Sequence, residues 1–179
     1  MREDGGLGTH LKRKRVPKRN SVSNRKTASA RHPLGKQIRQ NNEGPLRILV
    51  ADDQEDVRHG ICSLIEEAPD LEVCAEAVNG EEAVEKTIQL QPDLVILDIS
   101  MPVMNGLDAA RAIRACSPNT PILIVSIHEI QTMIDKAREI GVQGYVAKGQ
   151  VSNLLIDAIH KVMRHQKFFP EASNQQHMN

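Results

Sequence analysis

Two short runs in this sequence are apolar at every position, Leu94–Leu97 and Ile122–Val125. A strand with one face in water alternates apolar and polar residues, whereas a strand that is apolar on both faces needs a cover on each side. Such strands suit the centre of a parallel sheet with helices packed on both faces. These runs therefore predict the centre of a parallel α/β sheet.

The remainder of the chain, up to about residue 166, alternates strand patterns with helix patterns. Three further strands are predicted at residues 48–51, 72–77 and 143–147, and apolar residues at helical spacing follow each of the five strands. This alternation predicts an α/β fold with a doubly wound five-stranded parallel sheet of the flavodoxin-like type. With the wholly apolar strands in the middle, the expected strand order is 2-1-3-4-5.

The strand predicted at residues 72–77 suits an edge of this sheet. Its alternating pattern places Val73, Ala75 and Ala77 on one face and two glutamates on the other. One face is therefore expected to pack against helices while the other contacts water.

The net charge of zero conceals a division of charge along the chain. Residues 1–43 hold twelve Lys and Arg against three Asp and Glu, a net +9, so the remainder carries −9. Few apolar residues and no periodicity predict that residues 1–44 form a basic, disordered arm. Residues 45–166 would then be the folded domain, and residues 167–179 a polar tail that frays.

Neither a membrane span nor a disulfide framework is indicated. The longest apolar runs have four or five residues, whereas a membrane span needs about 20. Cys62, Cys74 and Cys116 are odd in number and have no paired spacing, which fits a reducing compartment. The sequence therefore predicts a cytoplasmic protein that does not contact a membrane.

Polar and charged residues stand directly after four of the predicted strands. In chain order these residues are Asp52, Asp53, Asp98, Ser126 and Lys148. Ligands of open parallel sheets bind beyond the carboxyl ends of the strands, where the strand order reverses. A single aspartate after a strand is more often a turn former or a helix cap, so it is the joint placement that predicts a shared site.

The chemistry of this cluster points to phosphoryl transfer. Three neighbouring carboxylates repel one another and favour a cation. Oxygen ligands of this kind suit Mg²⁺, which keeps several waters and accepts a phosphate as co-ligand. Lys148 offers a positive charge and Ser126 a hydrogen-bond donor to a phosphoryl group. Asp98, at the end of the central strand, is the best-placed nucleophile.

The residues that carry this pattern resemble the receiver domain of the response regulators of bacterial two-component systems, over residues 45–166. The matching segments are Leu49–Asp53 (LVADD), Leu94–Asn105 (LVILDISMPVMN) with Gly106, Ser126, and Gly144–Lys148 (GYVAK). The last helix and Phe168-Phe169-Pro170 are similar to receivers that precede a helix-turn-helix output domain. Since the chain ends before such a domain, the expectation is a stand-alone receiver. It departs from many members at Gly149, where they have proline.

The resemblance implies a role for each acidic residue. Asp98 would accept a phosphoryl group from a histidine kinase or a histidine phosphotransfer protein. The domain would be no enzyme in the usual sense, although it assists its own phosphorylation and dephosphorylation. Mg²⁺ would be held by Asp53, Asp98 and the backbone carbonyl of Ser100, with Asp52 acting largely through water.

The resemblance also implies a conformational switch. Lys148 would pair with the phosphoryl oxygens, Ser126 would turn its hydroxyl toward them, and Tyr145 would swing inward as Ser126 moves. From the residues alone, a single tyrosine in a strand is more often a packing residue, and that alternative stays open. The signal would appear on the last two helices and the last strand, for an unknown output partner or a homodimer formed on phosphorylation.

Two other interpretations are also open. The basic cluster within residues 12–19 could contact nucleic-acid phosphates, so that the receiver-like body regulates a nucleic-acid-binding arm. The arm has no aromatic residues for base stacking, which weighs against this interpretation. A phosphatase or phosphotransferase of another doubly wound family is the third. Such enzymes typically carry a second aspartate where this chain has Ser100.

Overall fold

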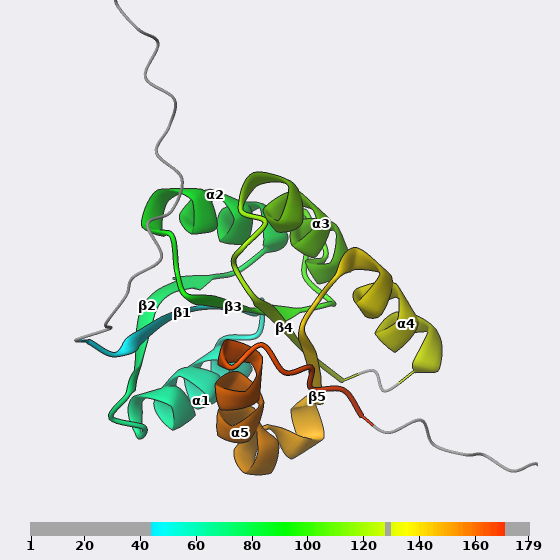
Figure 1. The fold of residues 1–179 in the computed structure, drawn as a ribbon. Helices are drawn as coiled ribbons and strands as arrows, with labels where there is room; N and C mark the ends of the chain where they lie inside the picture. Colours follow the sequence, from blue (N-terminus) through cyan, green and yellow to red (C-terminus); the bar gives the residue numbers. More distant parts are fainter. Residues whose placement is uncertain (1–43, 128–129, 171–179) are drawn as a thin grey trace, which may run out of the picture. The chain divides into compact units, whose positions relative to one another are not determined.

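The computed structural model describes residues 44–127 and 130–170. All five strands found there are parallel, and their order is β2-β1-β3-β4-β5, as the sequence predicts (Figure 1). None of the helices in these residues has the length and hydrophobicity that crossing a bilayer requires. In chain order the elements are β1 (Leu46–Ala51), α1 (Glu55–Glu66), β2 (Leu71–Ala77), α2 (Gly80–Leu90), β3 (Leu94–Asp98), α3 (Gly106–Cys116), β4 (Ile122–Ser126), α4 (Gln131–Ile140), β5 (Gly144–Ala147), a 3-10 helix (Lys148–Gln150) and α5 (Val151–Met163).

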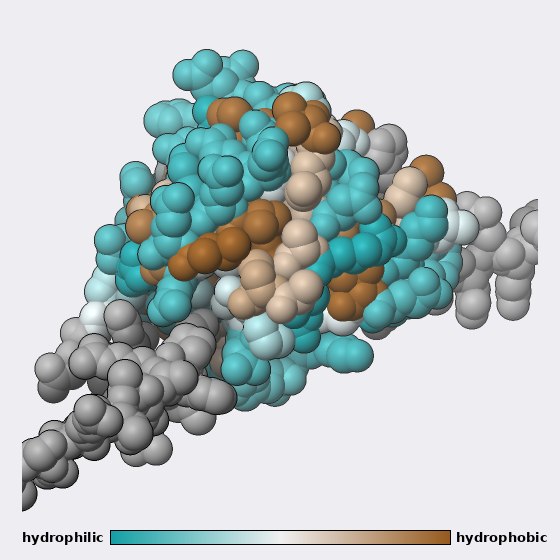
Figure 2. Space-filling view, turned by 90° about the horizontal axis from the view of Figure 1, so that it is seen from above, coloured by the Kyte–Doolittle hydropathy of each residue, from teal (hydrophilic) through white to brown (hydrophobic). Residues whose placement is uncertain are grey.

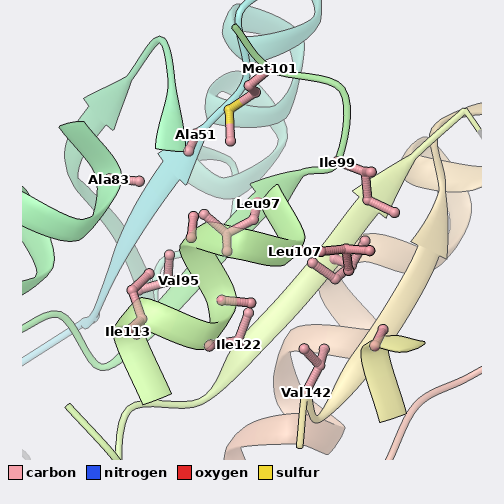
Figure 3. Close-up of a cluster of buried hydrophobic side chains, with 14 of the residues drawn as sticks. Ala51, Ala83, Val95, Leu97, Ile99, Met101, Leu107, Ile113, Ile122 and Val142 are labelled. Carbon is pink, nitrogen blue, oxygen red and sulfur yellow. The ribbon is translucent and has the colours of Figure 1, made fainter. Parts of the chain in front are cut away.

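Each face of the sheet has its own layer of helices and its own hydrophobic core. Helices α2, α3 and α4 cover one face, and α1 and α5 cover the other (Figure 1). Because side chains alternate along a strand, Leu49 and Val95 pack in the first core while Ile48 and Leu94 pack in the second. Figure 3 shows the first core, whose labelled side chains are all aliphatic apart from Met101. Every residue of β3 and β4 is buried, which confirms that these strands are covered on both sides.

Strand β2 is an edge strand, but its side chains do not alternate as predicted. The pairing with β1 shifts by one residue: Ile48 is opposite Val73, whereas Leu49 is opposite Ala75. The extra residue forms a β-bulge, which reverses the faces beyond it. Val73 therefore packs in the core under α1 and α5, while Ala75 and Ala77 pack in the other core. The prediction of one shared face for these three residues is wrong for this reason.

The segment after α5 pairs with the sheet at Phe168, where fraying was expected from residue 167. Phe168 forms a parallel bridge with Gly144 at the outer edge of β5. Its N–H donates to the carbonyl of Gln143 (3.0 Å), and its carbonyl accepts from the N–H of Tyr145 (2.6 Å). These backbone hydrogen bonds satisfy groups of an otherwise open strand edge, which explains why the chain does not fray there.

The outer surface of α2, α3 and α4 is mostly hydrophilic, with hydrophobic side chains gathered in a band across its middle (Figure 2). Four exposed large hydrophobic residues of the described part of the chain lie in loops that follow strands: Val78, Val103, Ile127 and Ile130. Two of them are the most exposed. Val103, 79% exposed, follows β3, and Ile127, 61% exposed, follows β4. Both loops leave the sheet at its carboxyl edge, where the polar cluster is expected.

Candidate functional site

The five residues expected to converge do meet at the carboxyl edge of the sheet. Asp52 and Asp53 follow β1, Asp98 ends β3, Ser126 ends β4, and Lys148 follows β5. The strand register accounts for the convergence, since Asp98 pairs with Val125 and Ser126 pairs with Ala147. Neighbouring parallel strands in this register end side by side, so their next residues point into one space.

Lys148 lies between two buried carboxylates. Its Nζ is 2.7 Å from Oδ2 of Asp52 and 3.4 Å from Oδ1 of Asp98. The lysine side chain is only 9% exposed, and both aspartates are 1% exposed. Because water is largely excluded here, the charges interact far more strongly than an exposed ion pair would. The ammonium therefore fixes the geometry of both carboxylates.

Each buried aspartate has one oxygen held by the backbone and one that faces Lys148. Oδ1 of Asp52 accepts from the N–H of Gln54 (2.9 Å), and Oδ2 of Asp98 accepts from the N–H of Ser100 (3.0 Å). The other two oxygens, Asp52 Oδ2 and Asp98 Oδ1, are buried and face the ammonium of Lys148. Their contact with Lys148 is a buried ion pair. A carboxylate oxygen can accept more than one contact, so each can still bind a further ligand beside the lysine.

The pocket carries more negative than positive charge. Carboxylate oxygens of Asp52, Asp53 and Asp98 lie within 4.8 Å of one another, and Asp53 is exposed. Three carboxylates against the single ammonium of Lys148 leave a formal charge of −2. Burial raises the pKa of Asp98, the charge of Asp52 raises it further, and Lys148 opposes both effects. A divalent cation with a preference for oxygen ligands, such as Mg²⁺, fits both this charge and the donor set.

The raised pKa of Asp98 predicts a pH dependence of stability in metal-free protein. A carboxyl group that binds its proton more tightly when folded stabilises the folded state at low pH, and this contribution is lost as pH rises. This stability should be lost as pH rises from 3.8, the ordinary pKa of an aspartate, to the raised pKa of Asp98 in the folded protein. Urea unfolding at a series of pH values, compared between the wild type and Asp98→Asn, measures this contribution. An identical pH dependence in the two proteins would contradict it.

The turn between β3 and α3 brings the backbone close to Asp98. Gly106, the first residue of α3, donates its N–H to the carbonyl of Ile99 (3.0 Å). A Cβ atom at position 106 would lie 1.9 Å from the backbone oxygen of Asp98. Only glycine fits so close an approach, so Gly106 is needed for the position of Asp98.

Gly106→Ala is therefore expected to destabilise the protein by about 3 kcal/mol, the upper end of the usual cost of overpacking, because the clash involves backbone that cannot rotate away. Gly149→Ala is the matched control, since a Cβ there would have no atom within 4 Å. Urea unfolding of both variants measures the difference. Equal stabilities for the two variants would show that the turn can relax.

Ser126 and Tyr145 are both completely buried. Tyr145 packs in the core beneath α2, α3 and α4, with Ile124 beside it in the neighbouring strand. Tyr145 therefore occupies an inward position. It lies in β5, three residues before Lys148.

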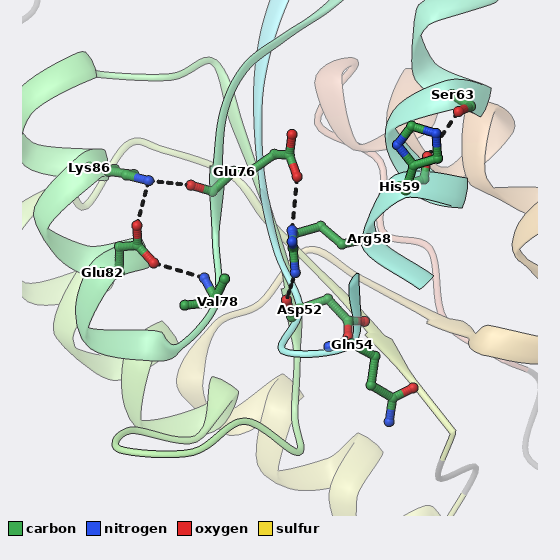
Figure 4. Close-up of polar contacts among 9 residues, drawn as sticks. All are labelled: Asp52, Gln54, Arg58, His59, Ser63, Glu76, Val78, Glu82 and Lys86. Atoms are coloured by element: carbon green, nitrogen blue, oxygen red, sulfur yellow. Dashed lines mark hydrogen bonds and ion pairs between the residues drawn. The ribbon is translucent and has the colours of Figure 1, made fainter. Parts of the chain in front are cut away.

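The sequence-based prediction missed one residue at the site, Arg58. Its Nη1 donates to the backbone carbonyl of Asp52 (2.8 Å), and its Nε pairs with Oε2 of Glu76 (2.8 Å; Figure 4). Arg58 lies in the first turns of α1, five residues after Asp53, and Glu76 lies near the end of the neighbouring strand β2. The opposite charges of Arg58 and Glu76, near the ends of neighbouring elements, were a signal in the sequence for this ion pair. The bulge in β2 concealed on which face of the sheet Glu76 lies.

Two of the sequence-based predictions fall outside the described residues. The basic cluster at residues 12–19 lies outside them entirely, and most of the tail predicted at residues 167–179 does so too. Their interpretation is unchanged by the structure.

A doubly wound sheet with three aspartates and a lysine at the carboxyl ends of its strands defines a receiver-type domain. The family model of the response regulator receiver domain matches residues 48–160. The chain therefore belongs to the response regulator receiver family, whose general function is phosphorylation-dependent signal transduction.

Individual relatives support this assignment. The chain is 37% identical to the chemotaxis protein CheY of Thermotoga maritima, over 66% of this chain and 98% of CheY. It is 35% identical to the nitrate/nitrite response regulator NarL of Escherichia coli K12, over 74% of this chain and 61% of NarL. A LuxR-family two-component response regulator from Aurantimonas sp. SI85-9A1 superposes with a TM-score of 0.67 at 34% identity, covering 70% of this chain and 89% of that one.

The chain does not span the whole of several relatives. It covers 53% of the transcriptional regulatory protein LnrK of Bacillus subtilis, to which it is 36% identical over 65% of its own length. The match to NarL is likewise limited to part of that protein. What these regulators do as whole proteins is therefore a separate question from what the receiver does.

Proposed function

We propose that Asp98 is the phosphoryl acceptor of this receiver, that the protein acts in the cytoplasm, and that a histidine kinase or histidine phosphotransfer protein is the donor. One observation carries the proposal. The buried carboxylate of Asp98 has one oxygen held by the backbone N–H of Ser100 and another that faces the ammonium of Lys148, within a cluster of three aspartates. A nucleophile needs such an available oxygen and a neighbouring positive charge to receive the incoming phosphoryl group.

In the proposed reaction, an oxygen of the Asp98 carboxylate attacks the phosphorus of a phosphohistidine. The P–N bond breaks, its electron pair stays on the imidazole, and an acyl phosphate forms on Asp98. Lys148, 3.4 Å from the acceptor carboxylate, provides a positive charge for the phosphoryl oxygens. The side chain of Ser126 is the proposed hydrogen-bond donor to the same oxygens. The domain positions and neutralises charge, so we infer a phosphoacceptor rather than an enzyme with its own substrate.

The metal that assists this transfer is proposed to be Mg²⁺. Asp53, Asp98 and the backbone carbonyl of Ser100 are the proposed ligands, and Asp52 would act largely through water. The close pairing of Asp52 with Lys148, at 2.7 Å, supports a less direct role for Asp52 than for Asp53. Bound there, Mg²⁺ would neutralise charge that builds up between the carboxylates and the phosphoryl group.

The proposed switch follows from the charge that the phosphoryl group adds. About −1.5 to −2 charges enter a pocket whose only positive side chain among the described pocket residues is Lys148. Shifting a two-state protein from 1:99 to 99:1 requires about 5.5 kcal/mol. New charge-assisted hydrogen bonds from Lys148 and Ser126, at about 1.5–3 kcal/mol each, are of the right size. Tyr145 is proposed to take the inward position, in which it lies in this structure, as Ser126 moves toward the phosphoryl group.

The proposed partners follow from the same edge of the sheet. Val103 and Ile127 offer exposed apolar contact beside the acidic pocket, which suits a donor domain that must approach Asp98. The surface of α4, β5 and α5 is the proposed output face, for an output partner or for a second copy after phosphorylation. Binding of nucleic acid by residues 12–19 is the second candidate, and no contact of the described residues favours it.

Incubation with a small phosphodonor such as acetyl phosphate tests the proposal. Phosphoryl incorporation should require Mg²⁺, stop on addition of a chelator, and be reversed by hydroxylamine, which cleaves acyl phosphates. Intact mass spectrometry measures the incorporation. A phosphoryl group that resists hydroxylamine, or that forms equally well without a divalent cation, would refute the proposal.

A further inference from the structure

We propose that Arg58 is a positioning residue for the metal pocket: it holds the peptide group between Asp52 and Asp53, and thereby sets the affinity for Mg²⁺. This inference depends on the proposed function only in that Mg²⁺ occupies the pocket. The juxtaposition that carries it is a largely buried guanidinium that contacts the backbone of Asp52 on one side and Glu76 on the other.

The first step of the argument concerns Asp52, which is fixed on four sides. Its N–H donates to the carbonyl of Ala77 (3.1 Å), and its carbonyl accepts from Arg58 (2.8 Å). Its carboxylate accepts from the N–H of Gln54 and pairs with Lys148. Among these contacts, only that of Arg58 holds the carbonyl, which belongs to the peptide group leading to the next residue.

The second step concerns Asp53, the proposed metal ligand that is exposed. The carboxylate of an exposed side chain is placed mainly by its backbone, because little packing restrains it. The peptide group before Asp53 is held by Arg58 at the Asp52 carbonyl, and the residue after it, Gln54, is held by the Asp52 carboxylate. Loss of the Arg58 contact should therefore free the backbone that carries the Asp53 carboxylate.

The third step concerns the anchor of Arg58 itself. Its side chain is 12% exposed and pairs with Glu76, near the end of β2. The same end of β2 is tied to α2, because Lys86 Nζ donates to the carbonyl of Glu76 and the N–H of Val78 donates to Glu82 (2.9 Å; Figure 4). Lys86 and Glu82 also pair with each other (2.6 Å). Arg58 is thus held between the acidic pocket and an edge strand that is itself fixed.

The charge of Arg58 makes the proposal easy to separate from a simple electrostatic effect. A positive guanidinium near the pocket repels Mg²⁺, so its removal by electrostatics alone would tighten Mg²⁺ binding. A positioning role predicts the opposite sign, because the ligand geometry is lost. The sign of the change therefore decides between the two.

The experiment is isothermal titration calorimetry of the full chain with MgCl₂, for the wild type and Arg58→Met. Methionine keeps the apolar length of the arginine side chain. We expect the Mg²⁺ dissociation constant of Arg58→Met to rise about tenfold, as for other residues that orient metal ligands. Arg58→Lys keeps a single donor group, so its Mg²⁺ dissociation constant should lie between those of the wild type and Arg58→Met. Arg111→Met is the matched control, because Arg111 is exposed on α3 and pairs only with Asp108 among its described contacts.

A second readout separates positioning from general damage to the fold. The rate of phosphorylation by acetyl phosphate should be low in Arg58→Met at limiting Mg²⁺ and should return to the wild-type rate at saturating Mg²⁺. A rate that stays low at saturation would overturn the proposal. So would Mg²⁺ binding by Arg58→Met that equals or exceeds that of a binding-competent wild type. If the wild type itself binds no Mg²⁺, it is the proposed function that fails.

Glu76→Gln covers the case in which Arg58→Met does not fold. This variant keeps Arg58 but weakens its anchor, and it should raise the dissociation constant about threefold, less than the tenfold or more expected when the orienting residue itself is lost. Glu72→Gln, which removes the same charge from an exposed position on β2, is its control. Equal affinities in these two variants would overturn the proposal.

Discussion

Asp98→Asn is expected to reduce phosphoryl incorporation from acetyl phosphate by at least about a hundredfold, because the amide cannot act as a nucleophile in place of the carboxylate. The other residues of the pocket stay in place, since asparagine has nearly the same shape. Intact mass spectrometry after incubation with Mg²⁺ measures the effect. The variant should remain folded, because it removes one of the mutually repelling charges.

Asp157→Asn is the control for this experiment. Asp157 is an exposed aspartate on α5 that pairs with Lys161 (2.8 Å), away from the pocket. Its substitution should leave incorporation at the wild-type level. If Asp98→Asn incorporated as much phosphoryl as this control, another residue would have to be the acceptor.

Lys148→Met is expected to lower the unfolding free energy of the metal-free protein by about 3 kcal/mol at neutral pH. The substitution removes the positive partner from two carboxylates that are each 1% exposed, and a buried charge without a partner is strongly destabilising. Acid should restore part of the loss, since protonation of one carboxylate removes the repulsion. Mg²⁺ should also restore part of it by replacing the missing charge. Urea unfolding at several pH values, with and without Mg²⁺, measures each effect.

Lys136→Met is the matched control, because Lys136 is exposed on α4. Its stability should lie within about 0.5 kcal/mol of the wild type, as is usual for surface substitutions. A Lys148→Met protein as stable as this control, with no gain from acid or Mg²⁺, would show that the lysine does not balance the pocket.

The centre of the sheet and the site at its edge could be predicted from sequence because each rests on strong, local signals. Leu94–Leu97 and Ile122–Val125 are apolar on both faces, and β3 and β4 are indeed buried at every position. Asp98 ends β3 and Lys148 directly follows β5, so the strand order brings Lys148 Nζ to within 3.4 Å of Asp98 Oδ1. A buried strand and the residue that ends it leave little freedom for another arrangement.

The features that the sequence did not reveal depend on tertiary context. A bulge in β2 reverses the faces beyond Val73, and nothing in a pattern of alternating residues marks where pairing with β1 shifts. Order at Phe168 comes from hydrogen bonds to the edge of β5, although the segment has no periodicity of its own. The contact of Arg58 with the Asp52 carbonyl joins a side chain to a backbone atom, a kind of pairing that residue types do not indicate.

Chemical mapping of the phosphoryl group tests the central claim most directly. The wild-type protein would be phosphorylated with acetyl phosphate and Mg²⁺ and then reduced with borohydride, which converts an aspartyl phosphate into homoserine. Tandem mass spectrometry of the peptide that contains β3 and the following turn would locate the product. The account predicts homoserine at position 98 and nowhere else. Homoserine at position 52 or 53, or a phosphoryl group retained on a serine, threonine or histidine, would contradict it.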